Sequence, residues 1–319
     1  MYDMMENRSR VAKGVFTASV RANRQIRERF YRLRLELSGA GAEAFARSKP
    51  GQFAQLDLSS TALPPAESIP ADLADASRRN IMLRRPFSFC HVNTKGGSTF
   101  VDILYCVVGP ASLRMTTLVA GDSISLIGPL GNGFSVPEGK KTALLVAGGM
   151  GAGPLQHLAQ VLTRDYADLK VMAFAGAKTA KALPFESQLD SISQRLGFSL
   201  GEFAKYGVES LVTTDDGSAG RSGLVTDCFA EWLGEAKLSR RDTAIYSCGP
   251  EAMLERMAET AREHGIDCQV CMERRMACGI GVCQSCPVEC KTSNAGDTVF
   301  KLCCKDGPVF DAKEVVFGR

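Results

Sequence analysis

The stretch Leu144-Leu-Val-Ala-Gly-Gly-Met-Gly-Ala-Gly-Pro-Leu155 joins an apolar run to a glycine-rich turn and then to the first residues of a helical pattern. A short run without polar residues is typical of a strand that is covered on both faces of a parallel sheet. Glycines between such a strand and a helix allow a phosphate group to approach backbone N–H groups at the positive end of the helix. The stretch therefore predicts an α/β unit with a phosphate site at its first turn.

The glycine pattern departs from the strict G-x-G-x-x-G fingerprint, because Pro154 stands where the third glycine is expected. A tight turn without a ligand is therefore an alternative interpretation. A second turn, Ser247-Cys-Gly-Pro250, follows the apolar run 243–247 and precedes another helical pattern. Ligands of open α/β sheets collect at the carboxyl ends of the strands, so the two turns together favour a bound nucleotide. The candidate contacts are Gly148, Gly149, Gly151, Pro154, Cys248, Gly249 and Pro250, and for Cys248 simple packing is the alternative.

Further apolar strands are expected at residues 170–175 and 210–212, with helical stretches between them, and their spacing suits a parallel sheet. The N-terminal part of the chain instead carries short β-rich segments. These lie at residues 15–20, 31–37, 86–92, 100–108 and 123–127. Short strands punctuated by turn residues predict a small antiparallel barrel or sandwich. Residues 59–80 are rich in Pro, Ala, Ser and Asp, which predicts a surface insertion or flexible loop.

Arg85-Pro-Phe-Ser88 opens one of these expected strands. An arginine beside a strand can pair with a diphosphate, and a serine three residues later can hydrogen-bond a planar ring that lies on the sheet. Considered alone, the four residues favour the alternative of a surface arginine followed by a proline in an edge strand. They are candidate ligand contacts only in combination with the other motifs.

Eight of the twelve cysteines lie between Cys268 and the C-terminus. Cys278-Gly-Ile-Gly-Val-Cys283-Gln-Ser-Cys286 is a C-x4-C-x2-C run, and the pair Cys303-Cys304 follows it. This spacing is that of plant-type 2Fe–2S sites, and the glycines allow the tight loop that brings three thiolates to one cluster.

Structural zinc is the alternative for this segment. Zinc sites usually pair C-x2-C with a second C-x2-C or with histidines, whereas His264 is the only histidine near the run. Iron–sulfur binding is therefore the preferred interpretation. Buried or spare thiols are expected for Cys268, Cys271, Cys290 and Cys303.

Composition narrows the class of protein. The chain has 319 residues, 45% hydrophobic and 23% charged residues, and a formal net charge of +3. This is a composition typical of a globular protein with more than one domain, and the charge is too small to indicate nucleic-acid binding. The first ten residues lack the apolar core of a signal peptide, and no apolar run is long enough to span a membrane, so a cytoplasmic location is expected.

Taken in order, several motifs resemble the ferredoxin reductase-like flavoproteins, and more closely the electron-transfer subunits of class 1B dihydroorotate dehydrogenase. The motifs are Pro50-Gly-Gln-Phe53, Arg85-Pro-Phe-Ser88, Gly128-Pro-Leu-Gly-Asn-Gly-Phe134, Gly148-Gly-Met-Gly-Ala-Gly-Pro154, Cys248-Gly-Pro250, Thr214-Asp-Asp-Gly-Ser218, Met276-Ala-Cys-Gly-Ile-Gly281 and Cys304-Lys-Asp-Gly-Pro-Val-Phe310. The resemblance implies an FAD-binding antiparallel β-barrel domain at 1–138, an NAD-binding α/β domain at 139–265 and a small 2Fe–2S domain at 266–319. It covers about residues 13–319 apart from 59–80.

The resemblance also implies roles for single residues. Arg85 would contact the FAD diphosphate, and Ser88, with Pro86 and Phe87 beside it, would lie at the reactive edge of the flavin. Where the family usually has a Gly-Thr pair, this chain has Pro110-Ala-Ser112, so that phosphate contact rests on Ser112 or is lost. The glycine turn and Cys248-Gly-Pro250 would frame the nicotinamide nucleotide. The implied cluster ligands are Cys278, Cys283, Cys286 and Cys304, the last because it opens the family-like Cys-Lys-Asp-Gly-Pro run.

The activity that the resemblance implies is oxidoreductase electron transfer. Electrons would pass from a dihydroorotate-oxidising subunit through the cluster and FAD to NAD⁺ in pyrimidine biosynthesis, within a hetero-oligomer, expected to be a heterotetramer. No acid or base for dihydroorotate oxidation is assigned to this chain. The alternatives are a diaphorase subunit that serves ferredoxin or a hydrogenase, and a zinc-stabilised adaptor without catalysis. Lys178 and Lys181 keep NADP open as an alternative to NAD.

Overall fold

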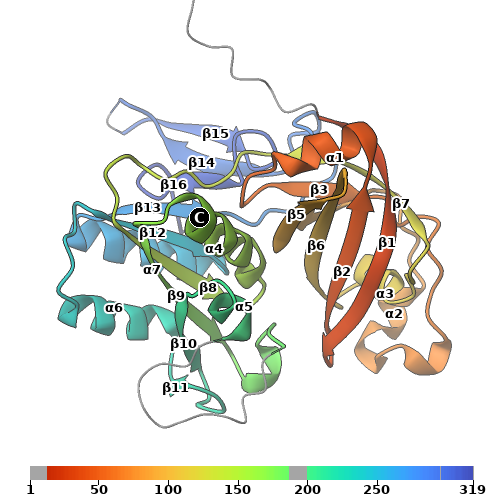
Figure 1. Cartoon of the computed structure of the whole chain (residues 1–319), viewed down its shortest axis with the longest axis horizontal. Helices are drawn as coiled ribbons and strands as arrows, with labels where there is room; N and C mark the ends of the chain where they lie inside the picture. Colours follow the sequence, from red (N-terminus) through yellow and green to blue (C-terminus); the bar gives the residue numbers. More distant parts are fainter. Residues whose placement is uncertain (1–12, 187–199, 295, 319) are drawn as a thin grey trace, which may run out of the picture.

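The computed structural model describes residues 13–186, 200–294 and 296–318, which form two large sheets side by side and a small third one (Figure 1). The first sheet is antiparallel, with strand order β4-β3-β7-β1-β2-β6-β5. Its strands are β1 (Gly14–Arg27), β2 (Phe30–Leu37), β3 (Phe53–Leu56), β4 (Arg85–Ser88), β5 (His91–Lys95), β6 (Ser98–Cys106) and β7 (Ser123–Leu130). Alternate side chains of β2, such as Leu33 and Leu35, enter its core, because successive residues of a strand face opposite sides.

The strand expected at residues 86–92 is two strands, β4 and β5, which are separated by Phe89 and Cys90 and lie at opposite edges of the first sheet. A connection of two residues can join these edges only if the sheet curls until they are neighbours. Figure 1 shows this half-barrel, whose open end is covered by α1 (Gly39–Ala46). The small helix α3 (Pro110–Met115) covers another part of the same core. The predicted barrel architecture is therefore confirmed as an antiparallel half-barrel.

Residues 59–80 differ from the expected flexible loop. They contain two short 3-10 helices, η1 (Ala66–Ser68) and η2 (Ala71–Leu73), and helix α2 (Ala74–Ser77). Leu73 is buried in the core of the half-barrel, and Asp72 accepts two hydrogen bonds from Arg29, at 2.6 and 2.9 Å. Helices this short leave no periodic pattern in the sequence. The burial of Leu73 and the ion pair of Asp72 with Arg29 could therefore not be predicted from the sequence.

The second sheet has strand order β11-β10-β9-β8-β12-β13-β16 and is parallel except at β16. Its strands are β8 (Thr142–Gly148), β9 (Lys170–Ala177), β10 (Glu209–Thr214), β11 (Arg221–Ser222), β12 (Thr243–Cys248), β13 (Asp267–Cys271) and β16 (Val309–Asp311). The helical segments around it are η3 (Gly149–Gly151), α4 (Ala152–Asp165), η4 (Ala180–Ala182), α5 (Gly201–Ala204), α6 (Val225–Glu235) and α7 (Glu251–His264). Leu144 and Val146 share a core with α6 and α7, whereas Leu145 and Ala147 share one with α4 and α5. Both faces of β8 are covered, which explains its unbroken apolar run.

The second sheet continues past residue 266, where the cluster domain was expected to begin. β13 continues the parallel sheet beside β12, and β16 adds an antiparallel edge strand to it. Only the segment between them projects from the sheet, and it carries the small hairpin of β14 (Pro287–Lys291) and β15 (Thr298–Leu302). The C-terminal module is thus built onto the nucleotide sheet, because the strands that bracket the cysteine run are part of that sheet.

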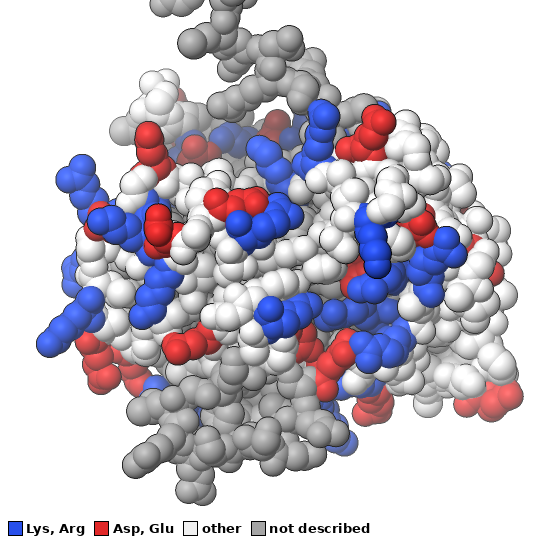
Figure 2. Space-filling model, in the orientation of Figure 1, with Lys and Arg blue, Asp and Glu red and all other residues white. Residues whose placement is uncertain are grey.

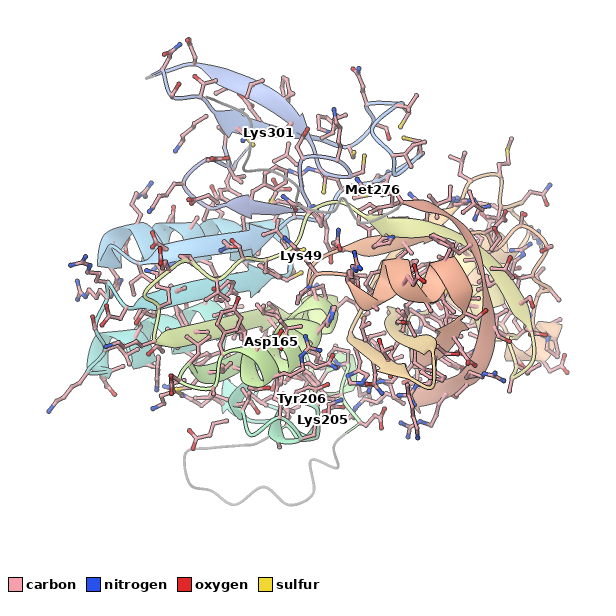
Figure 3. The ribbon with its side chains drawn as sticks, turned by 45° about the horizontal axis from the view of Figure 1, so that its top comes forward. Lys49, Asp165, Lys205, Tyr206, Met276 and Lys301 are labelled. Carbon is pink, nitrogen blue, oxygen red and sulfur yellow. The ribbon has the colours of Figure 1, made fainter. Side chains whose placement is uncertain are left out.

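The two large sheets meet through polar contacts. Lys205 and Tyr206 follow α5 and lie at this boundary (Figure 3), where the Tyr206 hydroxyl is 2.8 Å from Nδ1 of His91. The side chain of Gln160 in α4 accepts from the backbone N–H of Val92 at 3.2 Å and donates to its carbonyl at 2.7 Å. These polar contacts accompany an apolar cluster in which Phe53 and Leu130 of the half-barrel pack with residues of the second sheet such as Leu144.

The described surface shows neither a membrane span nor a strong charge bias. No helix within the described ranges is long and apolar enough to cross a membrane. On the face in Figure 2, lysines and arginines are interspersed with aspartates and glutamates. This mixture agrees with the small net charge of the chain.

His157 in α4 makes stability dependent on pH. Its side chain is buried, its Nδ1 has no hydrogen-bond partner among the described residues, and burial lowers its pKa to about 3. The unfolded chain binds a proton below about pH 6.5, whereas the folded protein does not, so stability falls as the pH drops from 6.5 towards 3. We expect a loss of about 2 kcal/mol between pH 6.5 and pH 5 from this residue.

Urea unfolding of the wild type and of the His157→Gln variant at pH 7 and pH 5 measures this contribution. Glutamine does not titrate, so the variant should lose less stability than the wild type over that interval. Equal losses in both proteins would assign the acid sensitivity to other groups.

Candidate functional site

A cavity of about 380 Å³ lies where the half-barrel, the nucleotide sheet and the cysteine segment meet. Its lining is mainly apolar, and Pro86, Phe87, Ser88, Pro154 and Cys248 from the predicted site are all part of it. Figure 3 shows Met276, which also lines the cavity, between the two large sheets. A largely apolar pocket of this volume with a few polar groups at its edge is what a planar organic cofactor requires, so the residues fit a flavin ring.

The two turns approach each other so closely that side chains larger than glycine would not fit at several of their positions. A Cβ on Gly151 would lie 1.9 Å from the carbonyl oxygen of Cys248, and a Cβ on Gly148 would lie 2.4 Å from Sδ of Met253. Gly249 is less tight, since its Cβ would lie 2.8 Å from Sδ of Met253 and 3.1 Å from Cα of Gly148. The turns after β8 and β12 therefore form one compact backbone surface at the carboxyl edge of the sheet, in front of α4. Such a surface can accept a phosphate at the N-terminus of that helix.

Arg85 and Ser112 do not line this cavity. Nη1 of Arg85 donates to the carbonyl of Leu83 at 2.7 Å and to that of Arg84 at 3.3 Å. The hydroxyl of Ser112 accepts from the N–H of Val108 at 2.9 Å and from that of Gly109 at 3.2 Å, at the start of α3. Ser112 therefore has a local structural role in the turn, which the sequence comparison with the Gly-Thr pair did not reveal.

Several residues that line the cavity were not singled out from the sequence. Phe53 and Tyr105 come from the half-barrel, Cys271 is the last residue of β13, and Met272 and Arg274 come from the segment between β13 and the cysteine run. Phe53 closes the quoted Pro50-Gly-Gln-Phe53 motif, which was a usable signal. The others carried none, because their position depends on pairing between distant strands.

The cysteine loop curls tightly beside β3. Gly279 and Gly281 have φ values of +72° and +85°, and a Cβ on Gly279 would lie 2.3 Å from Nε2 of Gln55. The buried side-chain amide of Gln55 has no hydrogen-bond partner among the described residues. These two glycines are thus needed for the backbone conformation and, at Gly279, for the close contact with the half-barrel.

The four predicted ligands stand as two neighbouring pairs. The first pair is Cys278 and Cys283, in which Sγ of Cys278 accepts a hydrogen bond from the N–H of Cys283 at 3.4 Å. The pKa of Cys283 is lowered to about 6, mainly by hydrogen bonds with Ser285 and to a smaller extent by those with Cys278. Cys304 forms the second pair with Cys286. Burial is the larger cause and the hydrogen bond with Cys286 the smaller one of a rise in the pKa of Cys304 to about 12.

No group of three His, Cys, Asp or Glu side chains in the described part of the chain is already arranged around a single ion. Three thiols on one glycine-rich loop and a fourth from Cys304 beside it, with N–H groups directed at the sulfur of Cys278, fit a cluster with two irons better than one tetrahedral zinc ion.

Cys303 and Cys304 point in different directions. Cys303 is fully buried, and its Sγ donates to the carbonyl of Met272 at 3.4 Å. Cys304 lies instead beside Cys286 and the N–H of Gly281. The geometry favours Cys304 as the fourth ligand.

Comparison with known proteins identifies the family. Residues 273–316 match the iron-sulfur cluster binding domain of dihydroorotate dehydrogenase B, and residues 145–259 match an oxidoreductase NAD-binding domain. The dihydroorotate dehydrogenase B (NAD(+)) electron transfer subunit of Bacillus caldolyticus is 35% identical over 93% of this chain and 97% of its own length. This chain belongs to that family. The corresponding subunit of Caldanaerobacter subterraneus is 33% identical over 94% of this chain and 98% of its own length.

Solved structures agree with this family membership. An NADH-dependent reduced ferredoxin-NADP oxidoreductase, studied for flavin-based electron bifurcation, is 25% identical and superposes with a TM-score of 0.69 over 94% of this chain and 90% of that chain. A ferredoxin NADP⁺ reductase from Neisseria gonorrhoeae with bound FAD and NADP shares the fold, with a TM-score of 0.54 at 16% identity over 82% of this chain and 95% of that chain. The expected ferredoxin reductase-like fold of electron transfer subunits of dihydroorotate dehydrogenase B is thus confirmed, and with it the expected classes of cofactor: FAD, an iron–sulfur cluster and NAD.

Proposed function

We propose that this chain passes electrons from a dihydroorotate-oxidising catalytic subunit, through a 2Fe–2S cluster and FAD, to NAD⁺ in pyrimidine biosynthesis. The observation that carries the proposal is the shared cavity. Met276, two residues before Cys278, lines the same space as Ser88 of the half-barrel and Cys248 of the nucleotide sheet. A flavin in that space supplies the conversion between two-electron hydride chemistry and one-electron cluster chemistry, which side chains cannot provide.

The residues around the cavity would hold and orient these groups. Ser88 offers a hydroxyl at the edge of the ring site, and Phe87 and Tyr105 supply apolar surface. Pro154 and Cys248 border the side of the cavity where the nicotinamide would enter, next to the paired glycine turns. Arg85 would reach a diphosphate by exchanging its two bonds to backbone carbonyls for bonds to phosphate oxygens.

Spectroscopy of anaerobically purified protein tests the cofactor part of the proposal. Absorption and EPR spectra before and after NADH should show an oxidised flavin that bleaches and a cluster that becomes paramagnetic on reduction. The reason is that hydride enters at the nicotinamide edge and single electrons continue to the cluster. Protein that contains zinc but neither flavin nor iron would instead be the zinc-stabilised adaptor.

Co-expression tests the partner. We infer a hetero-oligomer, because no residue for dihydroorotate oxidation is assigned to this chain and a partner must supply it. By the resemblance this hetero-oligomer is a heterotetramer. The co-purified complex should reduce NAD⁺ with dihydroorotate, whereas the isolated chain should not. Recovery with a ferredoxin or hydrogenase-type partner, and no dihydroorotate activity with the catalytic subunit, would replace this proposal by the diaphorase alternative.

A further inference from the structure

Two cysteines end neighbouring strands of the nucleotide sheet, and the electron-transfer function does not explain why they are paired. Cys248 is the last residue of β12 and Cys271 is the last residue of β13, and the parallel register pairs them directly (Figure 1). Paired residues of adjacent strands project to the same face of a sheet, and neighbouring strands are about 4.8 Å apart. Disulfides join Cα atoms that are about 4.4 to 6.8 Å apart, so the backbone places this pair within bonding range.

Both side chains face the cofactor cavity. Cys248 and Cys271 are free cysteines, they are 2% and 5% exposed, and both line the cavity that Ser88 and Met276 also line. The pKa of Cys248 is raised well above its ordinary value, mainly by a hydrogen bond with the side chain of Cys271 and secondly by burial. The two side chains are therefore joined by a hydrogen bond between their sulfurs. Only molecules small enough to enter the cavity can reach them.

The neighbouring cysteines do not compete directly for this pairing. Cys303 lies close to Cys271, but its Sγ is directed at the carbonyl of Met272. Cys268 is on the same strand as Cys271 and belongs to the core on the other face of the sheet. It therefore offers a matched control, a buried cysteine in β13 that does not reach the cavity.

We propose that Cys248 and Cys271 form a redox-active dithiol that closes reversibly to a disulfide inside the cofactor cavity. The oxidant is a peroxide. One of the two cysteines releases its proton, and its thiolate attacks hydrogen peroxide, which takes up that proton and gives a sulfenic acid and one water. The second thiol then displaces a second water from that sulfur. Two S–H bonds break and one S–S bond forms, while the two electrons and two protons of the pair reduce the peroxide to water. A small dithiol reverses the reaction by exchange.

The disulfide would change the nicotinamide end of the cavity without using a cluster ligand. Closing the bond pulls the Cys248 sulfur towards β13, away from the place where the nicotinamide would lie. This consequence rests on the proposed function, whereas the disulfide itself does not. Reaction of reduced flavin with oxygen produces peroxide, so the pair lies where such an oxidant would arise.

Mass spectrometry of the whole purified protein tests the pair. The protein is treated with a few equivalents of hydrogen peroxide while cluster absorption is monitored, then blocked with N-ethylmaleimide and digested without reduction. We expect a peptide that joins Cys248 to Cys271, which disappears after dithiothreitol. The Cys271→Ser variant should lack this peptide, and the Cys268→Ser variant should keep it.

Rapid-mixing measurements test the consequence. The rate of flavin reduction by NADH should fall at least about tenfold after peroxide and recover after dithiothreitol. No linked peptide in the wild type, or one that joins Cys248 to Cys303, would overturn the proposal. A linked peptide in a protein that lacks dihydroorotate activity would uphold the dithiol and reject only the proposed partner.

Discussion

The Cys304→Ser variant is expected to be purified with at least about tenfold less iron per chain than the wild type, whereas Cys303→Ser should keep its full cluster. Cys304 lies beside Cys286 and the N–H of Gly281, inside the loop that holds the other predicted ligands. Cys303 is turned away towards the carbonyl of Met272, to which a serine hydroxyl can donate in its place. Iron and sulfide analysis, with the EPR spectrum of the reduced protein, measures the difference.

The two variants form a matched pair, because they make the same change at adjacent buried positions. Thermal unfolding of both proteins without iron controls for a general loss of stability. Full iron in Cys304→Ser together with loss of the cluster in Cys303→Ser would reverse the assignment of the fourth ligand.

The second large effect is expected from Gly151→Ala. The added Cβ would lie 1.9 Å from the carbonyl oxygen of Cys248, a backbone atom that cannot move without shifting the second glycine turn. Overpacking of this kind costs about 1 to 3 kcal/mol of stability. Because both turns border the proposed nucleotide site, we also expect the rate of flavin reduction at low NADH concentration to fall by about two orders of magnitude.

Gly234→Ala is the control for this change. Gly234 lies in α6, and no other atom would lie within 4 Å of its Cβ, so alanine should raise helix stability by up to about 1 kcal/mol and leave flavin reduction unchanged. Stopped-flow mixing with NADH and thermal unfolding measure both quantities. A Gly151→Ala protein that is reduced by NADH as fast as the wild type would show that the contact between the turns is not needed for nucleotide binding.

Much of the fold was predictable because its signals are local. The unbroken apolar runs of β8 and β12 predicted a parallel sheet covered on both faces, and helices do cover both faces. The short strands separated by turn residues predicted the antiparallel half-barrel. The pieces that could not be predicted are those without periodicity, such as the helices between residues 59 and 80, whose position depends on the burial of Leu73 and the pairing of Asp72 with Arg29.

The candidate site was predictable to a smaller extent. Motifs located Ser88, Pro154 and Cys248, which share one cavity in the structure. For Ser112 the resemblance left open whether it contacts a phosphate or the contact is lost, and the structure adds that its hydroxyl is bonded to the backbone of its own turn. The partners of this hydroxyl depend on the local backbone conformation, which a sequence motif does not specify.

The sequence alone determined the chemistry available to this protein: a cysteine loop with the spacing of a 2Fe–2S site, two glycine turns after apolar strands, and the order of the three modules. Spacing and periodicity are properties of residues that are close in sequence, so they can be recognised without a structure. Only the tertiary structure decided that Cys304 rather than Cys303 faces the loop, that Gly151 must lack a side chain because of Cys248, and that Cys248 and Cys271 touch. Each of these facts depends on strands or turns that are distant in sequence and become neighbours when the sheets form, and the direction of a side chain is set by that packing.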